Sequence, residues 1–113
     1  MDPNSTGLNP VWRNSLVYTA FGTSWKDGAN STAIEAARQL LIQDMKIVEA
    51  IAPESGAYLN EASRYELDWK KSFFGTHYDK LRAIKQKYDP QSLFLIYEGI
   101  ASDEWDADLV CRA

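Results

Sequence analysis

The chain has 113 residues, of which 45% are hydrophobic and 12% aromatic, so its length suits one domain with a packed core rather than two domains. There are 16 acidic and 12 basic residues, and this excess of negative charge argues against a nucleic-acid partner because phosphate binding needs a basic surface. No apolar run approaches the roughly 20 residues that span a bilayer, so no membrane partner is expected.

Residues 1–10 are rich in Pro, Asn and Ser and are predicted to form a linker. They lack the basic and apolar regions of a signal peptide, although an upstream part of the protein could carry a leader. Two tripeptides match the acceptor pattern for N-linked glycans, Asn4-Ser5-Thr6 and Asn30-Ser31-Thr32. Such tripeptides also arise by chance, so they give only weak support for a secreted glycoprotein.

Residues 12–25 are rich in aromatic and β-branched side chains and are predicted to form one long strand. Large apolar residues fall on both faces of that strand, which indicates that both faces are at least partly covered. A single strand needs a sheet, and the chain offers few other strands, so most of the sheet is expected to be missing. The exposed strand edge predicts self-association of the isolated chain.

The next segment has the pattern of an amphipathic helix that begins at Asn30, Ser31 or Thr32 and runs to about Ile51. Its apolar residues recur at helical spacing, and Pro53 ends it. The apolar stripe consists of Ile34, Ala37, Leu40, Leu41, Met45, Val48 and Ile51.

Four short elements are expected in the remainder of the chain. They are an extended segment at 57–60, a helix at 68–74, a helix at 77–88 that Thr76 caps, and a short strand at 93–97. The predicted fold class is therefore α+β: a fragment with one long strand, an amphipathic helix, and a helical C-terminal element with a short strand.

No metal site is expected, because one His, one Cys and scattered carboxylates show no ligand spacing. His77 is interpreted as a packing residue at a helix start rather than as a base. Cys111 is the single cysteine, and it is either a free thiol near solvent or half of a disulfide to another chain or segment.

Tyr58 and Asn60 are the candidate binding residues. Residues two apart in an extended segment face the same way, so the phenol and the amide can converge on one ligand. An amide offers donors and an acceptor, which suits the edge of a heterocycle such as the pyrimidine ring of a flavin. A phenol can polarise or deprotonate a substrate hydroxyl if its surroundings lower its pKa from about 10. The alternative is that Tyr58 packs at a strand end and Asn60 closes a turn.

Five motifs in this order resemble the C-terminal region of berberine-bridge-enzyme-like FAD-linked oxidoreductases, in the vanillyl-alcohol-oxidase superfamily, and most closely their secreted fungal branch. Each motif alone is modest, but together they cover nearly the whole chain from Asn9. The motifs are Asn9-Pro10-Val11-Trp12-Arg13, Gly56-Ala57-Tyr58-Leu59-Asn60-Glu61-Ala62, Phe74-Gly75-Thr76-His77-Tyr78-Asp79-Lys80-Leu81, Ile84-Lys85-Gln86-Lys87-Tyr88-Asp89-Pro90 and Ser102-Asp103-Glu104-Trp105.

The resemblance implies that residues 11–52 end the substrate-binding domain and that residues 53–113 form the berberine-bridge-like C-terminal element. It implies that Tyr58 and Asn60 lie beside the isoalloxazine ring of FAD, that Tyr58 is a candidate catalytic residue, and that the helix after Tyr78 packs on the FAD domain. Members of the family oxidise alcohols, sugars or secondary metabolites by hydride transfer to FAD. The family is also the main reason to expect a secreted protein.

The chain departs from the family pattern at two points. No segment matches the FAD-binding domain, which lies upstream in the family and carries the phosphate-contacting loops and the residues that attach flavin covalently. Glu61 stands where plant relatives usually have a tyrosine, so a plant-type catalytic tyrosine cannot be assigned there.

Two functions are therefore weighed. The first is the C-terminal part of an FAD-dependent oxidoreductase, which needs an upstream FAD-binding and substrate domain and is inactive alone. The second is a stand-alone, non-catalytic interaction module derived from such an enzyme.

Overall fold

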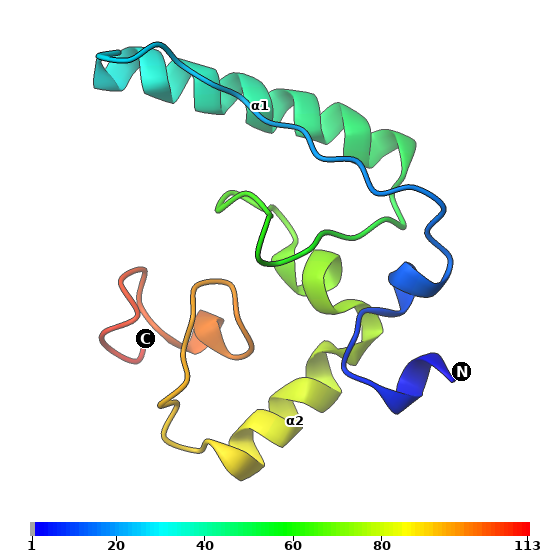
Figure 1. Cartoon of the computed structure of the whole chain (residues 1–113). Helices are drawn as coiled ribbons and strands as arrows, with labels where there is room; N and C mark the ends of the chain where they lie inside the picture. Colours follow the sequence, from blue (N-terminus) through cyan, green and yellow to red (C-terminus); the bar gives the residue numbers. More distant parts are fainter. Residues whose placement is uncertain (1) are drawn as a thin grey trace. The chain divides into compact units, whose positions relative to one another are not determined.

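The computed structural model of the chain describes residues 2–113, and they form two compact units. One unit is Ser15–Ser55, and the other joins the residues up to Asn14 with Gly56–Ala113. The two α-helices are α1, Ser31–Ile51, and α2, Tyr78–Tyr88 (Figure 1). Five short helical turns accompany them: η1 Pro3–Ser5, η2 Pro10–Arg13, η3 Lys70–Phe74, η4 Gly75–His77 and η5 Ser102–Glu104.

The predicted amphipathic helix is confirmed as α1. The side chain of Asn30 caps it, because its Oδ1 accepts a hydrogen bond of 2.9 Å from the backbone N–H of Ala33. The helix ends at Ile51, two residues before Pro53. No residue of α1 is fully buried, and Leu40 and Ile51 of its apolar stripe are 60% and 80% exposed.

The predicted long strand at 12–25 is wrong. Its first residues belong to η2, which begins at Pro10, and residues 15–26 follow an irregular path in Figure 1. A strand is stabilised by a ladder of hydrogen bonds to a neighbouring strand, and the described part of the chain offers none. The side chains of Leu16 and Val17 are 98% and 77% exposed.

Asn9 holds the second unit together. Its side chain is buried, with 4% exposed, and its Nδ2 donates to the backbone carbonyls of Lys71 and Ser72 at 3.2 and 3.0 Å. Its Oδ1 accepts from the backbone N–H of Val11 at 3.1 Å, which starts η2. One amide therefore fixes the N-terminal segment to η3, more than 60 residues away in the sequence.

Aromatic rings form the small core of this unit where η3, η4 and α2 follow one another. The ring of Trp69 lies edge-on to those of Phe74 and Tyr78, with centroids 6.3 and 5.6 Å apart. Phe73, Tyr78 and Ala101 are its buried hydrophobic residues. The predicted helix at 68–74 is present as η3, a π-helical turn that ends at Gly75. The helix predicted from His77 begins at Tyr78, and Thr76 lies in η4 rather than capping it.

The predicted short strand at 93–97 is also wrong, because side chains near the end of α2 use its backbone groups locally. The carboxylate of Asp89 accepts from the N–H groups of Leu93 and Phe94 at 2.8 and 3.0 Å, and Lys85 Nζ donates to the carbonyl of Phe94 at 2.6 Å. Lys85 and Asp89 also form an ion pair whose side chains are only 13% and 11% exposed. The segment becomes a closed turn that leaves Phe94 83% exposed.

The α+β fold class is therefore corrected to a helical one. Across residues 2–113 the pairing of extended backbone is limited to a single isolated bridge between Trp105 and Arg112. In the same described range, no helix combines the length and the apolar character needed to cross a bilayer.

The contribution of the buried Asn9 amide to stability can be tested. We expect Asn9→Ala to lower the free energy of unfolding by about 1–3 kcal/mol, because the N–H of Val11 loses its acceptor and the carbonyls of Lys71 and Ser72 each lose one of their hydrogen bonds inside the unit. Urea unfolding followed by tryptophan fluorescence measures this change. Asn14→Ala, at an exposed position of the same segment, is the control and should change it by less than about 0.5 kcal/mol. Equal unfolding midpoints for the two variants would contradict the role of Asn9.

Candidate functional site

Tyr58 and Asn60 lie close together, although on a turn and not on an extended segment. The backbone N–H of Glu61 donates to the carbonyl of Tyr58 at 2.9 Å, so residues 58–61 form the turn. Asn60 Nδ2 donates to Tyr58 Oη at 2.8 Å. The expected convergence of the two side chains is therefore present, but the turn produces it in place of strand alternation.

The backbone next to this pair is held closely against η3. The N–H of Ala57 donates to the carbonyl of Ser72 at 2.9 Å. A Cβ added at Gly56 would stand 2.7 Å from that same carbonyl oxygen and 3.0 Å from Asn9 Nδ2, so only glycine fits there. The Asn9 amide thus supports the approach to the candidate site as well as the fold.

The pair presents a polar edge to solvent. The side chain of Tyr58 is 47% exposed. After the bond between them, Tyr58 keeps its own O–H donor, and Asn60 keeps an acceptor oxygen and one N–H. This alternation of donor and acceptor groups is suited to a planar heterocycle with carbonyl and N–H groups on its rim.

A second polar cluster, Lys70, Tyr78 and Asp103, was not identified from the sequence. Tyr78 Oη donates to Asp103 Oδ1 at 2.8 Å and accepts from the N–H of Ala101 at 3.3 Å. Lys70 Nζ pairs with Asp103 Oδ2 at 2.7 Å and lies 4.9 Å from the centroid of the Tyr78 ring. The cluster ties η3, α2 and η5 together, and Arg82 reinforces it by pairing with Glu104.

The ionisation of this cluster suits a structural role. Burial, together with the hydrogen bond to the Asp103 carboxylate, raises the pKa of Tyr78 to about 12. Burial alone would raise the pKa of Asp103, but hydrogen bonds from Lys70 and Tyr78 lower it overall. Tyr78 therefore stays a neutral donor to a charged carboxylate and is poorly suited to act as a base.

Glu98 is a further titratable group with little exposure. Glu98 is 9% exposed, and its backbone φ is 53°. Burial raises the pKa of Glu98, the charge of Glu66 raises it too, and the charge of Arg64 lowers it. Glu66 itself accepts a hydrogen bond from Ser72 Oγ at 2.7 Å.

His77 lies in the interior, as expected for a packing residue. It is 4% exposed, its Nε2 lies 3.2 Å from Asn4 Oδ1, and its Nδ1 has no hydrogen-bond partner. Within residues 2–113, no three His, Cys, Asp or Glu side chains are grouped so that they could hold a metal ion. Cys111 is an exposed free thiol.

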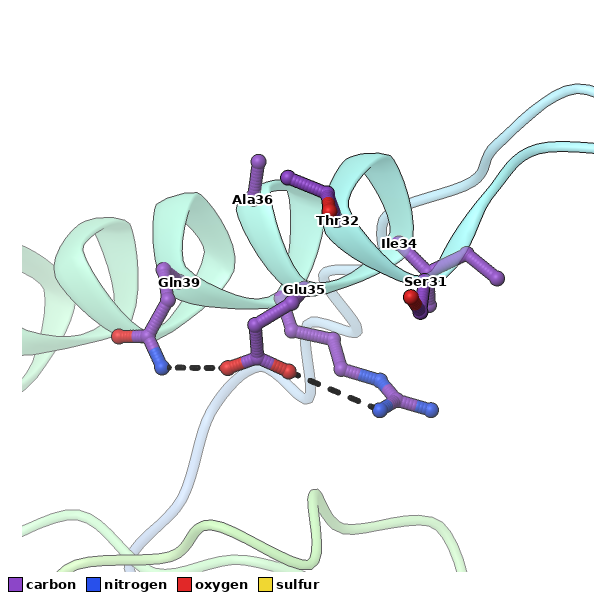
Figure 2. Close-up of a pocket in the computed structure, with 7 residues that line it drawn as sticks. Ser31, Thr32, Ile34, Glu35, Ala36 and Gln39 are labelled. Atoms are coloured by element: carbon purple, nitrogen blue, oxygen red, sulfur yellow. Dashed lines mark hydrogen bonds and ion pairs between the residues drawn. The ribbon is translucent and has the colours of Figure 1, made fainter.

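An open depression of about 730 Å³ lies along the first turns of α1 (Figure 2). Its walls come from side chains of that helix alone, between Ser31 and Gln39. Glu35 accepts from Gln39 Nε2 at 2.8 Å and pairs with Arg38 at 3.7 Å, so its charge is already balanced within the helix (Figure 2). The depression brings together no group that points to catalysis.

Comparison with known proteins gives one family match. Residues 57–101 match the family model described as "Berberine and berberine like". That range includes the Tyr58–Asn60 turn, the aromatic core and α2. No solved structure matches the chain.

Curated relatives match over most of the chain. They include an "Uncharacterized FAD-linked oxidoreductase" of Arthroderma benhamiae, 33% identical over 96% of this chain, and the FAD-linked oxidoreductase patO of Penicillium expansum, 38% identical over 92%. The VAO-type flavoprotein oxidase VAO615 of Thermothelomyces thermophilus is 34% identical over 96%. The chain covers 18%, 19% and 20% of these relatives, respectively, about a fifth of their length.

The Tyr78 cluster predicts an unusual phenol titration. A raised folded-state pKa means that neutral Tyr78 stabilises the fold fully below the unfolded value of about 10, and that this contribution is lost as pH rises through about 12. Ultraviolet absorbance of tyrosinate should show a late component that Tyr78→Phe removes. Tyr88→Phe is the control, because Tyr88 is 75% exposed and its loss should leave the late component intact. A late component that survives in Tyr78→Phe would contradict the assignment.

Proposed function

Because this chain is a relative of the berberine-bridge-enzyme-like FAD-linked oxidoreductases, we propose that it works as the C-terminal part of such an enzyme. The observation that carries the proposal is the match of residues 57–101 to the family model, together with relatives named FAD-linked oxidoreductases that match over most of the chain. The chain corresponds to only about a fifth of those relatives, so the rest of the active site belongs to an upstream FAD-binding and substrate domain.

Only part of an FAD site fits the residues present. The exposed turn of Tyr58 and Asn60 offers donors and an acceptor that suit the pyrimidine edge of a flavin ring. The described residues include no glycine-rich loop before a helix that could hold the cofactor's phosphates. The chain therefore contributes one wall of the site, and FAD is held mainly by the upstream domain.

The proposed reaction is oxidation of an alcohol, a sugar or a secondary metabolite. FAD supplies the two-electron acceptor for the hydride when it is bound. Asn60 would orient the ring through its amide, and Tyr58 is the candidate to polarise the substrate hydroxyl through its phenol oxygen. The hydrogen bond from Asn60 positions that oxygen and leaves the O–H group of Tyr58 available to the substrate.

The exposed apolar side chains support an incomplete unit that completes its packing on a larger domain. The described residues hold only three buried hydrophobic residues, and large ones such as Leu16, Leu93 and Phe94 are more than three-quarters exposed. Exposed apolar area of this kind marks an interaction surface. We therefore propose that the isolated chain is inactive and that the upstream domain is its main partner.

Flavin binding tests the proposed function. We expect the chain alone to carry no stoichiometric FAD, and to carry it when produced together with the segment encoded in frame upstream. Visible flavin absorbance of the purified proteins measures this. A chain that binds FAD stoichiometrically by itself would contradict the proposal, and a gene with stop codons in place of the upstream segment would favour the stand-alone interaction module.

The same complex tests Tyr58 directly. In the complete enzyme, Tyr58→Phe should retain flavin and lower turnover by roughly 10²–10⁴-fold, the range expected when a general acid–base group is lost. Tyr65→Phe is the matched control, because Tyr65 has the same 47% exposure as Tyr58 and lies outside the turn. Unchanged turnover in Tyr58→Phe would remove the catalytic role and leave a binding role only.

Self-association of the isolated chain is also expected. Residues 12–25 form no strand edge, but the apolar side chains of residues 15–26 are exposed and can pack against a second copy of the chain. Light scattering of the purified chain should give a mass above the 12.8 kDa monomer that rises with concentration. The pair Leu16→Asp and Val17→Asp should restore the monomer, whereas the control Thr19→Asp should not. A monomer for the unaltered chain at high concentration would contradict the expectation.

A further inference from the structure

The oxygen and the nitrogen of the Asn30 side-chain amide lie in different environments. Its Oδ1 accepts the hydrogen bond from the N–H of Ala33 and caps α1. The side-chain amide is planar, so its nitrogen points away from the helix when its oxygen faces the first turn. Asn30 is exposed, and Nδ2 makes no hydrogen bond within the described unit.

The two residues that follow complete an acceptor pattern for N-linked glycans. Ser31 and Thr32 are the first residues of α1, and both are exposed. The pattern Asn-Xaa-Thr requires a hydroxyl at its third position and any residue except proline at its second. The sequence signal and an exposed, unpaired amide nitrogen therefore coincide at this helix start.

We propose that Asn30 carries an N-linked glycan while it continues to cap α1. The donor is an oligosaccharide joined through its first sugar to a lipid pyrophosphate, which an oligosaccharyltransferase supplies in the secretory pathway. A bond forms between Nδ2 and C1 of that sugar as the bond from C1 to the phosphate oxygen breaks. The amide loses one proton, and the lipid pyrophosphate leaves with the electrons of the broken bond.

The modification is compatible with the fold because it changes only the nitrogen end of the amide. A glycosylated asparagine still has its carbonyl oxygen, so the hydrogen bond from Ala33 persists. The sugar extends from the N-terminal end of α1, where Asn30, Ser31 and Thr32 are all exposed and no buried side chain needs to move.

The second pattern, at Asn4, has a different environment. Asn4 Oδ1 faces Nε2 of the buried His77, and the backbone carbonyl of Asn4 accepts from Lys80. A glycan at Asn4 would therefore lie beside the packed unit rather than at a free helix end. The proposal concerns Asn30, and its test reads the peptide that contains residue 30.

The test is to express the full chain behind a secretion leader in a yeast and to analyse the peptide that contains residue 30 by mass spectrometry. The expected result is a glycan on Asn30 that an amidase removes, leaving aspartate. Thr32→Ala should abolish the glycan, whereas the matched variant Thr32→Ser should retain it, because only the former removes the hydroxyl. An unmodified Asn30 peptide in the unaltered chain would overturn the proposal.

Hydrogen exchange at Ala33 tests the retained cap independently of the glycan's presence. The glycosylated chain and the sugar-free Thr32→Ala variant should protect the Ala33 N–H equally. Asn30→Ala should lose that protection several-fold, because it removes the cap. Faster exchange at Ala33 in the glycosylated chain than in Thr32→Ala would show that sugar and cap are incompatible, which would overturn the dual role.

Discussion

The buried amide of Asn9 is the interaction on which the folded part of the chain depends. It donates hydrogen bonds to the carbonyls of Lys71 and Ser72 and accepts one from the N–H of Val11. Two glycines pass so close to this amide that a side chain at either position would collide with it. A Cβ at Gly75 would stand 2.5 Å from Asn9 Oδ1, and a Cβ at Gly56 would stand 3.0 Å from Nδ2. The buried amide and the two glycines therefore act together. Hydrogen bonds hold this unit where its apolar core is small.

The elements that the sequence predicted correctly are those whose causes are local. The helix α1 follows from an asparagine cap, a helical apolar period and a proline near its end, all within one segment. The helix α2 was predicted to within a residue because its helical apolar period and the proline near its end, Pro90, are local too, although no side chain caps it. Its start was misplaced because Gly75, with a φ of 56°, ends η3 and sends the chain through η4 before α2 begins.

The two strand predictions were wrong because the local sequence pattern favours a strand while the described part of the chain supplies no neighbouring strand to pair with. Residues 12–25 have the composition of a strand, but a strand needs partners that the described chain does not provide, and Asn9 with Pro10 turns its first residues into η2. Residues 93–97 have the composition of a strand too, yet Lys85 and Asp89 bind the backbone groups of Leu93 and Phe94. The composition predicts what a segment favours, whereas the available hydrogen-bond partners decide what it forms.

In the candidate site, too, features with local causes could be predicted and features that depend on long-range contacts could not. Tyr58 and Asn60 are two residues apart, so their convergence could be predicted from the sequence even though the turn that produces it was not. Lys70, Tyr78 and Asp103 are separated by up to 33 residues, and only the folded chain brings them together. The Asn9 amide and the hydrogen bond from Ala57 to Ser72 hold the backbone beside Tyr58 without a large hydrophobic core, so the turn can be preformed while apolar side chains such as Leu93 and Phe94 remain exposed. A unit built in this way can present a shaped surface to a larger domain before that domain covers it, because its geometry depends on its own hydrogen bonds rather than on the partner.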